Sequence, residues 1–308
     1  MGRTPRHVVV VGAGVGGLAA AVDLARQGVA VTVVEAGARA GGKLRQLEVG
    51  GAGIDAGPTV FTMRWVFEGL FGDAGASLDA ELELAPAGVL ARHAWRSGGR
   101  LDLFSDVERT VAAIGDFAGA TEARAYREFC ARAADMYATL RPALMTAQRP
   151  SPWSLGARVG WLHLDRLART APLTSLWTAL GQHFRDPRLR QLFGRYSTYV
   201  GAAPAVAPAA LMVIAHVERE GVWLVAGGMR RVAEALQRLG ERHGVRCRFG
   251  TAVTRIDVTG GRATGVTLAD GERLQADAVV FNGDISALGD GLLGDAVRGA
   301  ARRTPVAE

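Results

Sequence analysis

Apolar and polar positions in the first 35 residues predict a strand, a turn, a helix and a second strand. Val8 to Val11 is a continuous β-branched run, which is typical of a parallel strand buried on both faces. Leu18 to Arg26 has a helical pattern, and Gly28 follows it as a C-terminal cap. A second apolar run, Ala30 to Val34, ends at Glu35. Together these elements predict a complete βαβ unit.

After this unit the pattern changes to short alternating segments, then to helical periodicity, and then back to strands. The alternating segments predict a small antiparallel sheet made of Glu81 to Leu84, Leu90 to Trp95 and Arg100 to Phe104, with Ser97-Gly98-Gly99 as a hairpin turn. The helical segments begin near Val107 after the cap Asp106 and continue with Ala118 to Leu140, Trp161 to Phe193 and Leu211 to Val217. The last segments are an amphipathic helix ending at Leu239 and the strands Val245 to Phe249, Ala252 to Val258, Ala263 to Leu268 and Ala278 to Phe281.

This order of elements predicts an α/β fold with two domains. We expect residues 1–75 and 222–308 to form a Rossmann-like nucleotide-binding domain, because a βαβ unit opens it and strands return at its end. Residues 76–221 are expected to form an inserted domain of mixed sheet and helices. The chain has 308 residues, of which 49% are hydrophobic, so it can bury a substantial core.

Four glycines stand between the first strand and the helix. Gly12, Gly14 and Gly17 have the spacing GxGxxG, and Gly16 lies among them. Gly12 allows a sharp turn, Gly14 allows the backbone to approach a diphosphate, and Gly17 allows close helix packing. The helix N-terminus supplies free N–H groups for phosphates, and Glu35 can accept hydrogen bonds from a ribose diol. The segment therefore predicts a binding site for an ADP group.

FAD and NAD both contain ADP, and the residues after Glu35 distinguish them. Arg39, Gly41, Gly42 and Lys43 follow it in an order that resembles the second motif of glutathione-reductase-type flavoproteins. This resemblance implies that the segment wraps the ribose and diphosphate of FAD, with the arginine near the phosphates and the glycines allowing close backbone approach. A basic surface loop is the alternative interpretation.

A third segment, Gly53 to Thr59, resembles the D-x-G-P motif of FAD-dependent carotenoid desaturases and related amine oxidases. Taken alone it predicts a tight turn, because Pro58 fixes its own φ and restricts Gly57. The resemblance implies that Gly57, Pro58 and Thr59 lie beside the flavin. The continuation, Thr59 to Phe67, is more similar to bacterial hydroxycarotenoid desaturases than to phytoene desaturases.

The family resemblance extends over essentially the whole chain. It implies FAD-dependent desaturation of a hydroxylated or methoxylated acyclic carotenoid, in which one hydrogen leaves as hydride to the flavin and one as a proton. It also implies a backbone contact from Val253 to adenine. No catalytic base can be named from the sequence. Arg64 and Tyr196 are candidates for positioning only.

Family members continue beyond the length of this chain and end in a second glycine-rich segment that binds the flavin ring and diphosphate. Nothing after Asp284 matches that segment, so we expect an N-terminal fragment that lacks the C-terminal part of the fold and is inactive alone. Two alternatives stay open. One is another flavin oxidase that acts on an amine or on protoporphyrinogen, and the other is an inactive truncated remnant.

Charge and composition narrow the expected partners. The net charge is +6, but Lys43 is the only lysine beside 35 arginines, and the basic residues are spread along the chain without interleaved aromatic residues. This distribution disfavours nucleic acid and favours weak attraction to an anionic membrane surface. Cys130 and Cys247 lack metal-ligand spacing, so we expect reduced cysteines and no metal site.

The uncharged stretch Val200 to Ala215 is too short and too rich in proline to cross a bilayer alone. It is interpreted either as an interfacial or tunnel-lining segment or as an ordinary buried helix. We therefore expect a cytoplasmic protein, peripheral on the inner membrane, whose inserted domain faces the membrane and an apolar polyene substrate.

Overall fold

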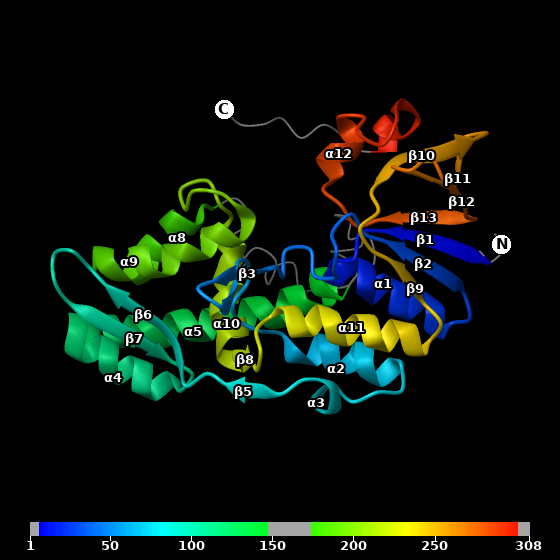
Figure 1. Ribbon diagram of the computed structural model, residues 1–308. Coiled ribbons are helices and arrows are strands. Elements are labelled where there is room, and N and C mark those ends of the chain that lie inside the picture. The colour runs from blue at the N-terminus through cyan, green and yellow to red at the C-terminus, as the bar shows by residue number, and fades with distance from the viewer. Residues whose placement is uncertain (1–5, 147–173, 301–308) are drawn as a thin grey trace. The chain divides into compact units, whose positions relative to one another are not determined.

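The computed structural model describes residues 6–146 and 174–300. The chain forms two compact units (Figure 1). Unit 1 comprises Met1–Ala85 and Trp223–Glu308, and unit 2 comprises Pro86–Val222. The assignment of cofactor binding to the first unit and of substrate and membrane contact to the second stays a prediction.

Unit 1 is built on a four-stranded parallel sheet with the strand order β13-β1-β2-β9. The strands are β1 (His7–Val11), β2 (Ala30–Val34), β9 (Arg246–Arg248) and β13 (Ala278–Phe281), and the helices α1 (Val15–Arg26) and α11 (Arg230–Arg242) belong to the same unit. In β1, Val8 and Val10 pack with the residues of α1 and α11, whereas Val9 packs with residues of a second sheet. Burial on both faces explains why this strand is continuously apolar.

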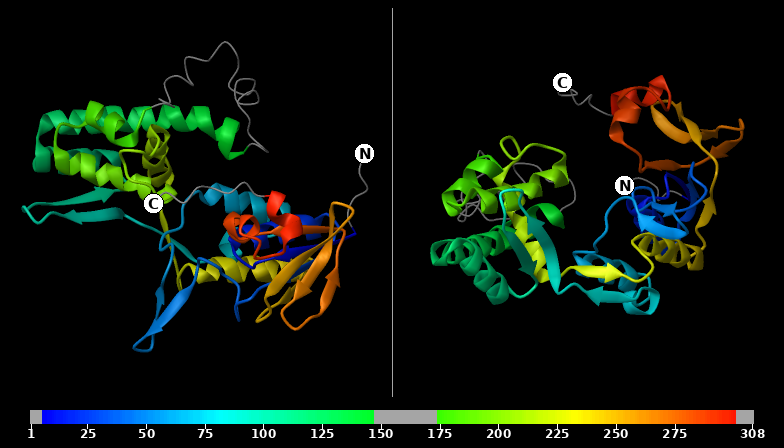
Figure 2. Two further views of the ribbon diagram at one scale, coloured as in Figure 1. Left: turned by 90° about the horizontal axis from the view of Figure 1, so that it is seen from above. Right: turned by 60° about the vertical axis from the view of Figure 1, so that its left-hand side comes forward.

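Unit 1 also contains elements outside this sheet. They are β3 (Gln46–Val49), β4 (Ala52–Asp55), α2 (Arg64–Asp73), α3 (Leu78–Glu81), β5 (Leu84–Pro86), β8 (Trp223–Val225), β10 (Val253–Thr259), β11 (Arg262–Leu268), β12 (Arg273–Gln275), α12 (Ile285–Gly289) and η5 (Asp295–Ala300). Strands β10, β11 and β12 form the second sheet. The β3–β4 hairpin extends away from the parallel sheet (Figure 2) and exposes Leu47, Val49 and Ile54.

One expectation for unit 1 was wrong. The segment Glu81 to Leu84 is not a strand, because Leu78 and Leu82 are both buried one helical turn apart and α3 forms between them. The strand follows at β5 and pairs with β8 rather than with its neighbours in sequence. The third segment, Gly53 to Thr59, begins within the last residues of β4.

Unit 2 contains a hairpin and a group of helices. The hairpin is β6 (Val89–Ala94) and β7 (Arg100–Phe104), as predicted. The helices are α4 (Val107–Ala118), α5 (Ala120–Leu140), η1 (Arg141–Met145), α8 (Leu176–His183), α9 (Pro187–Gly194), η3 (Arg195–Val200), η4 (Ala209–Met212) and α10 (Val213–Glu220). Asp106 caps α4 as predicted, since its carboxylate accepts a hydrogen bond from the Arg109 N–H at 2.7 Å. Part of the expected helical segment Trp161 to Phe193 lies outside the described residues.

The uncharged stretch that begins at Val200 divides into two parts. Val200 and Val206 are 52% and 76% exposed, and the neighbouring Tyr199 is 60% exposed. Ala209 and Met212, in contrast, are fully buried in the core of unit 2. The second part is therefore ordinary core, and the first is an exposed apolar surface.

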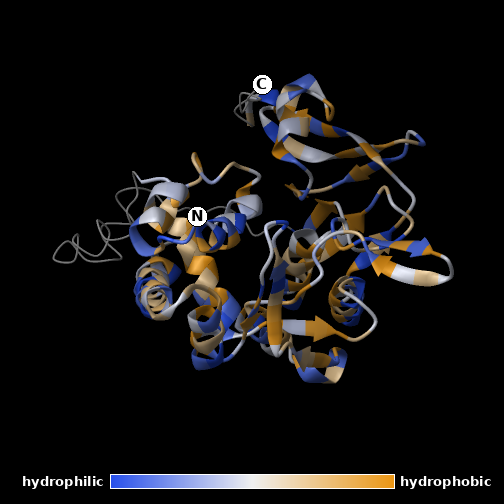
Figure 3. Cartoon of the chain, turned by 90° about the vertical axis from the view of Figure 1, so that its left-hand side faces the viewer, coloured by the Kyte–Doolittle hydropathy of each residue, from blue (hydrophilic) through white to orange (hydrophobic). Residues whose placement is uncertain are grey.

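Hydrophobic and hydrophilic residues alternate along the helices (Figure 3). Among the described helices, none combines the length and the apolar character needed to span a membrane.

Candidate nucleotide-binding site

The glycine turn after β1 leaves the N-terminus of α1 open to a ligand. Gly12 has a φ of 101°, and its N–H donates to the Val34 carbonyl at 2.8 Å, which ties the turn to β2. A Cβ on Gly17 would overlap with the Gly12 carbonyl oxygen, so only glycine fits there. Gly14 occupies the N-cap position and provides no side-chain cap. The first N–H groups of α1 therefore remain available for phosphate oxygens.

Glu35 is held at the carboxyl end of β2 by two backbone groups. Its Oε2 accepts a hydrogen bond from the Ala13 N–H at 2.7 Å, and its Oε1 accepts one from the Gly37 N–H at 2.8 Å. Each carboxylate oxygen can accept a further hydrogen bond, so a ribose hydroxyl can still be bound. The Thr251 N–H donates to the Glu35 carbonyl at 3.0 Å, which brings Val253, at the start of β10, close to the end of β2.

The second segment lies directly against the glycine turn. The Gly41 N–H donates to the Ala13 carbonyl at 2.9 Å. Gly42 has a φ of 57°, and a Cβ on it would lie 3.1 Å from the Gly14 Cα. The two backbones approach this closely because neither carries a side chain at the contact. The first two predicted segments are thus brought together.

A cavity of about 350 Å³ adjoins this contact. It is lined by Glu35, Gly37, Ala38, Arg39, Ala40, Gly41, Gly42, Arg45, Gln46 and Arg230. Its three arginines favour an anionic ligand. Arg230 comes from α11, where its Nε lies 3.0 Å from Glu234 Oε1, and it was not among the residues predicted from the sequence. The only signal was its place after Gly-Gly-Met, because the contact joins residues far apart in the chain.

The third segment packs on the second. A Cβ on Gly57 would overlap with the Lys43 carbonyl oxygen. Asp55 Oδ2 accepts a hydrogen bond from the Met229 N–H at 2.9 Å, and a Cβ on Gly228 would lie 2.8 Å from Asp55 Oδ1. Asp55 therefore connects the third segment to the start of α11, a role that the sequence did not reveal.

Several predicted residues are exposed around this contact region. They are Gly16, Arg39, Gly42, Lys43, Gly57, Pro58 and Thr59. Their exposure leaves them accessible to a ligand, and their roles toward FAD stay predictions.

The two candidate positioning residues are engaged with other protein groups. The Arg64 guanidinium lies 2.7 Å from Glu68 and 2.6 Å from Asp79, and these carboxylates raise the pKa of Arg64. Tyr196 is buried in unit 2, and its hydroxyl donates to Glu218 Oε2 at 3.0 Å. Burial raises the pKa of Tyr196 well above its usual value, so the phenol stays neutral. Neither contact identifies a catalytic base.

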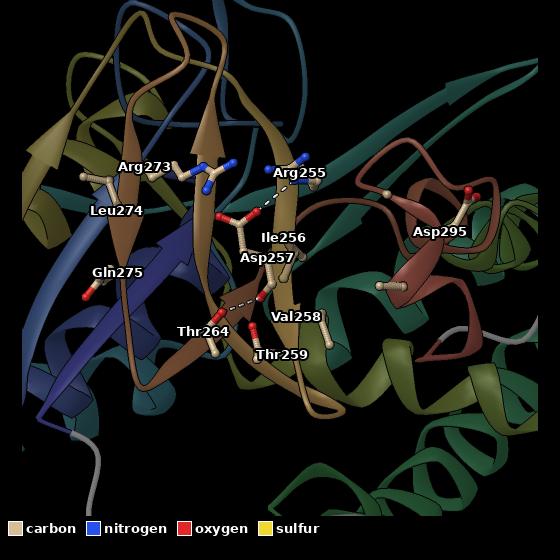
Figure 4. A pocket seen from close by; sticks show the side chains of 12 residues that line it. Arg255, Ile256, Asp257, Val258, Thr259, Thr264, Arg273, Leu274, Gln275 and Asp295 are labelled. Carbon is tan, nitrogen blue, oxygen red and sulfur yellow. Dashed lines mark hydrogen bonds and ion pairs between the residues drawn. The ribbon is translucent and has the colours of Figure 1, made fainter.

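A second cavity of unit 1, about 640 Å³, lies between the β10–β12 sheet and η5 (Figure 4). Arg255 Nε pairs with Asp257 Oδ1 at 2.8 Å within it, and Thr264 Oγ1 donates to the Asp257 carbonyl at 3.3 Å. None of the predicted cofactor residues lines this cavity. Arg255 also donates a hydrogen bond from Nη2 to Thr267 Oγ1 at 3.1 Å, which connects β10 with β11.

The residue types that hold metals do not gather in the described part of the chain, where no three His, Cys, Asp or Glu residues form a candidate cluster. Both cysteines are free. Burial raises the pKa of Cys247 to about 11 and also raises the pKa of Cys130. Both thiols are therefore protonated, and unreactive as nucleophiles, at neutral pH.

Comparison with known proteins identifies the family. The family model described as flavin containing amine oxidoreductase matches residues 15–307. The chain is 52% identical over 299 residues to the hydroxyneurosporene desaturase of Rubrivivax gelatinosus, covering 97% of this chain and 57% of the relative. It is 48% identical to the protein of the same name from Cereibacter sphaeroides, covering 94% of this chain and 58% of that one. A solved structure of putrescine oxidase has a TM-score of 0.58 at 19% identity, covering 94% of this chain and 60% of that chain.

The chain thus spans less than two thirds of the length of these relatives. Their similarity confirms the predicted resemblance to carotenoid desaturases, and among them to hydroxyneurosporene desaturase, also called methoxyneurosporene dehydrogenase. The family and the flavoenzyme fold support FAD as the cofactor. Because the family model matches most of its residues, the chain belongs to the flavin-containing amine oxidoreductase family.

Proposed function

We propose that this chain holds the ADP end of FAD in an enzyme that desaturates a hydroxylated or methoxylated acyclic carotenoid of the hydroxyneurosporene type. The observation that carries the first part is the convergence of three separate sequence segments. A Cβ on Gly42 would crowd Gly14 and a Cβ on Gly57 would overlap with Lys43, so these two close contacts connect all three segments. The carotenoid substrate is inferred from the names of the two hydroxyneurosporene desaturases to which the chain is similar.

The residues present fit an ADP group. The glycine turn and the exposed N-terminus of α1 offer N–H donors and a positive dipole end to the diphosphate. Arg39 and Arg230 line the adjoining cavity and add positive charge, and Glu35 offers acceptor oxygens to the ribose. A flavin bound at this site supplies the hydride acceptor for the oxidation. The chain's own part is to fix the cofactor through its ADP end.

ADP titration of the purified chain tests the cofactor half of the proposal. Arg39→Ala should weaken ADP binding about tenfold through loss of one phosphate contact. It should leave adenosine binding unchanged. Arg92→Ala is the matched control, because Arg92 is 76% exposed in unit 2 and pairs with Asp102. A wild-type chain that binds neither ADP nor FAD would contradict the proposal.

A chimera tests the substrate half. This chain replaces the corresponding part of the Rubrivivax gelatinosus desaturase, and the purified product receives hydroxyneurosporene or phytoene in liposomes. A red shift of the polyene absorbance is expected with hydroxyneurosporene and not with phytoene. Gly14→Val in the same chimera should remove the flavin absorbance, because its side chain blocks backbone approach to the diphosphate. Preference for phytoene would reverse the substrate assignment.

We further propose that unit 2 contacts the surface of the inner membrane through Tyr199, Val200 and Val206. These apolar side chains are exposed, and an apolar polyene leaves a bilayer through such a surface. Vesicle flotation of the chain checks this. Replacing Val200 and Val206 by serine should reduce binding, whereas Leu47→Ser and Val49→Ser in the β3–β4 hairpin should not. Equal effects of the two pairs would contradict the assignment.

A further inference from the structure

Asn282 is the only asparagine among the 308 residues, and it lies directly after β13. Its N–H donates to the Val11 carbonyl at 2.9 Å, so it sits beside the point where the glycine turn begins. The sheet order reverses here, since β13 lies on one side of β1 and β2 on the other. Ligands of open parallel sheets bind in the crevice at this switch point, outside the carboxyl ends of the strands.

The carboxamide of Asn282 lies over the glycine turn. A Cβ on Gly14 or on Gly17 would come within 3.0 Å of Asn282 Nδ2, and a Cβ on Gly16 would come within 2.7 Å of its Oδ1. At three of the predicted glycines, a side chain would therefore crowd Asn282 as well as a bound ligand. They make room for one polar side chain that arrives from the neighbouring strand.

This carboxamide has unused hydrogen-bonding capacity. Within the described residues, no group forms a hydrogen bond with it. A carboxamide has two N–H donors and an acceptor oxygen. A half-buried amide beside the free N–H groups of a helix N-terminus is suited to donate to an anion.

A second rare residue lies at the same edge. Lys43 is the only lysine in a chain with 35 arginines. Asp284 lies two residues after Asn282, and its pKa is lowered mainly by hydrogen bonds from Ser286. The positive charge of Lys43 lowers this pKa further. The Lys43 side chain therefore places positive charge near the residues that follow β13.

We infer that Asn282 binds the diphosphate of the ADP group, donating a hydrogen bond from Nδ2 to a phosphate oxygen, and also supports the glycine turn. This inference rests on the proposed function. A neutral donor is required at this position, because a carboxylate of the same shape would repel the phosphates. The side chain reaches the site only through the β13–β1 pairing.

The test compares Asn282→Leu and Asn282→Asp with the wild-type chain by titration with ADP and with adenosine. Asn282→Leu should weaken ADP binding about fivefold to tenfold, the value of one hydrogen bond. Asn282→Asp should weaken it about a hundredfold, and salt at about 0.5 M should reduce this extra loss by screening. Adenosine, which lacks phosphates, should bind all three proteins equally.

Gln27→Glu is the matched control, since it makes the same amide-to-acid change on an exposed side chain at the opposite end of α1. It should leave ADP binding unchanged. Equal losses of ADP and adenosine in the Asn282 variants would overturn the inference, because the carboxamide would then only support the turn. A wild-type chain that binds adenosine and ADP equally, or neither, would instead overturn the proposed function.

Discussion

At the scale of single residues, Gly57 joins the second and third segments by having no side chain. We expect Gly57→Ala to lower the free energy of unfolding of unit 1 by about 1–3 kcal/mol, because its Cβ would overlap with the Lys43 carbonyl oxygen, which belongs to the backbone. Gly69→Ala in α2 is the control. It has open space around it and should stabilise the helix by about 0.5–1 kcal/mol. Urea unfolding of both variants measures the difference, and a neutral Gly57→Ala would show that the contact can relax.

The site residues that could be predicted from the sequence are those carried by local motifs. Gly12, Gly14 and Glu35 follow from their spacing around one strand and one helix. Asn282 and Arg230 could not be found this way, because each reaches the site by pairing or packing with residues more than 180 positions away. An isolated functional residue such as Asn282 or Arg230 produces no periodic pattern in the sequence. For Asn282, the sequence offered two signals, its uniqueness and the resemblance of Asn282-Gly283-Asp284 to a segment that ends near the cofactor in flavin desaturases.

At the scale of elements, long or strongly patterned segments were predictable. β1, β2 and the amphipathic helix α11 have the expected positions, because continuous β-branched runs and a regular apolar stripe define them. The error at α3 arose where four residues carry both a period-two and a period-four pattern. Tertiary packing of Leu78 and Leu82 decided between them.

The histidines of unit 2 predict a dependence of stability on pH. Burial lowers the pKa of His93, His183 and His216 from the usual value of 6.5. Below about pH 6.5 the unfolded chain binds more protons than the folded one, so the free energy of unfolding falls as the pH falls toward the folded-state pKa values. Above that pH the contribution is fully present.

Urea unfolding at several pH values between about 7.5 and 5.5 measures this slope, which is at most about 1.4 kcal/mol per pH unit for each histidine. The double variant His183→Gln and His216→Gln removes two of the three titrating groups. Its stability should therefore vary less with pH than that of the wild type. An unchanged slope would assign the acid sensitivity to carboxylates instead.

At the scale of the whole molecule, every residue proposed to bind ADP belongs to unit 1, which is made of two separate parts of the chain. Within unit 1, the Ala226 N–H donates to the Glu83 carbonyl at 3.0 Å, so the two parts meet where unit 2 is inserted. Unit 2 begins and ends at one place as well, since the Ala87 N–H donates to the Val222 carbonyl at 2.8 Å.

Replacing Pro86–Val222 by a short Gly-Ser linker should therefore leave ADP binding within about threefold of the intact chain. Calorimetric titration with ADP checks this, and circular dichroism confirms that the shortened chain is folded. The same deletion with Asn282→Asp provides the control for binding at the intended site. Loss of all ADP affinity in a folded shortened chain would mean that unit 2 contributes to the nucleotide site.

The pairing of β1 with β13 also determines how long β1 stays unpaired on one side during translation. Val8 is synthesised 270 residues before its partner Ala278. At about 5–20 residues per second, one edge of β1 waits roughly 10 to 60 s for its neighbour. During that time a run of four valines presents unpaired N–H and C=O groups to other nascent chains. Yield in a heterologous host should accordingly depend on chaperones that shield this edge until β13 is synthesised.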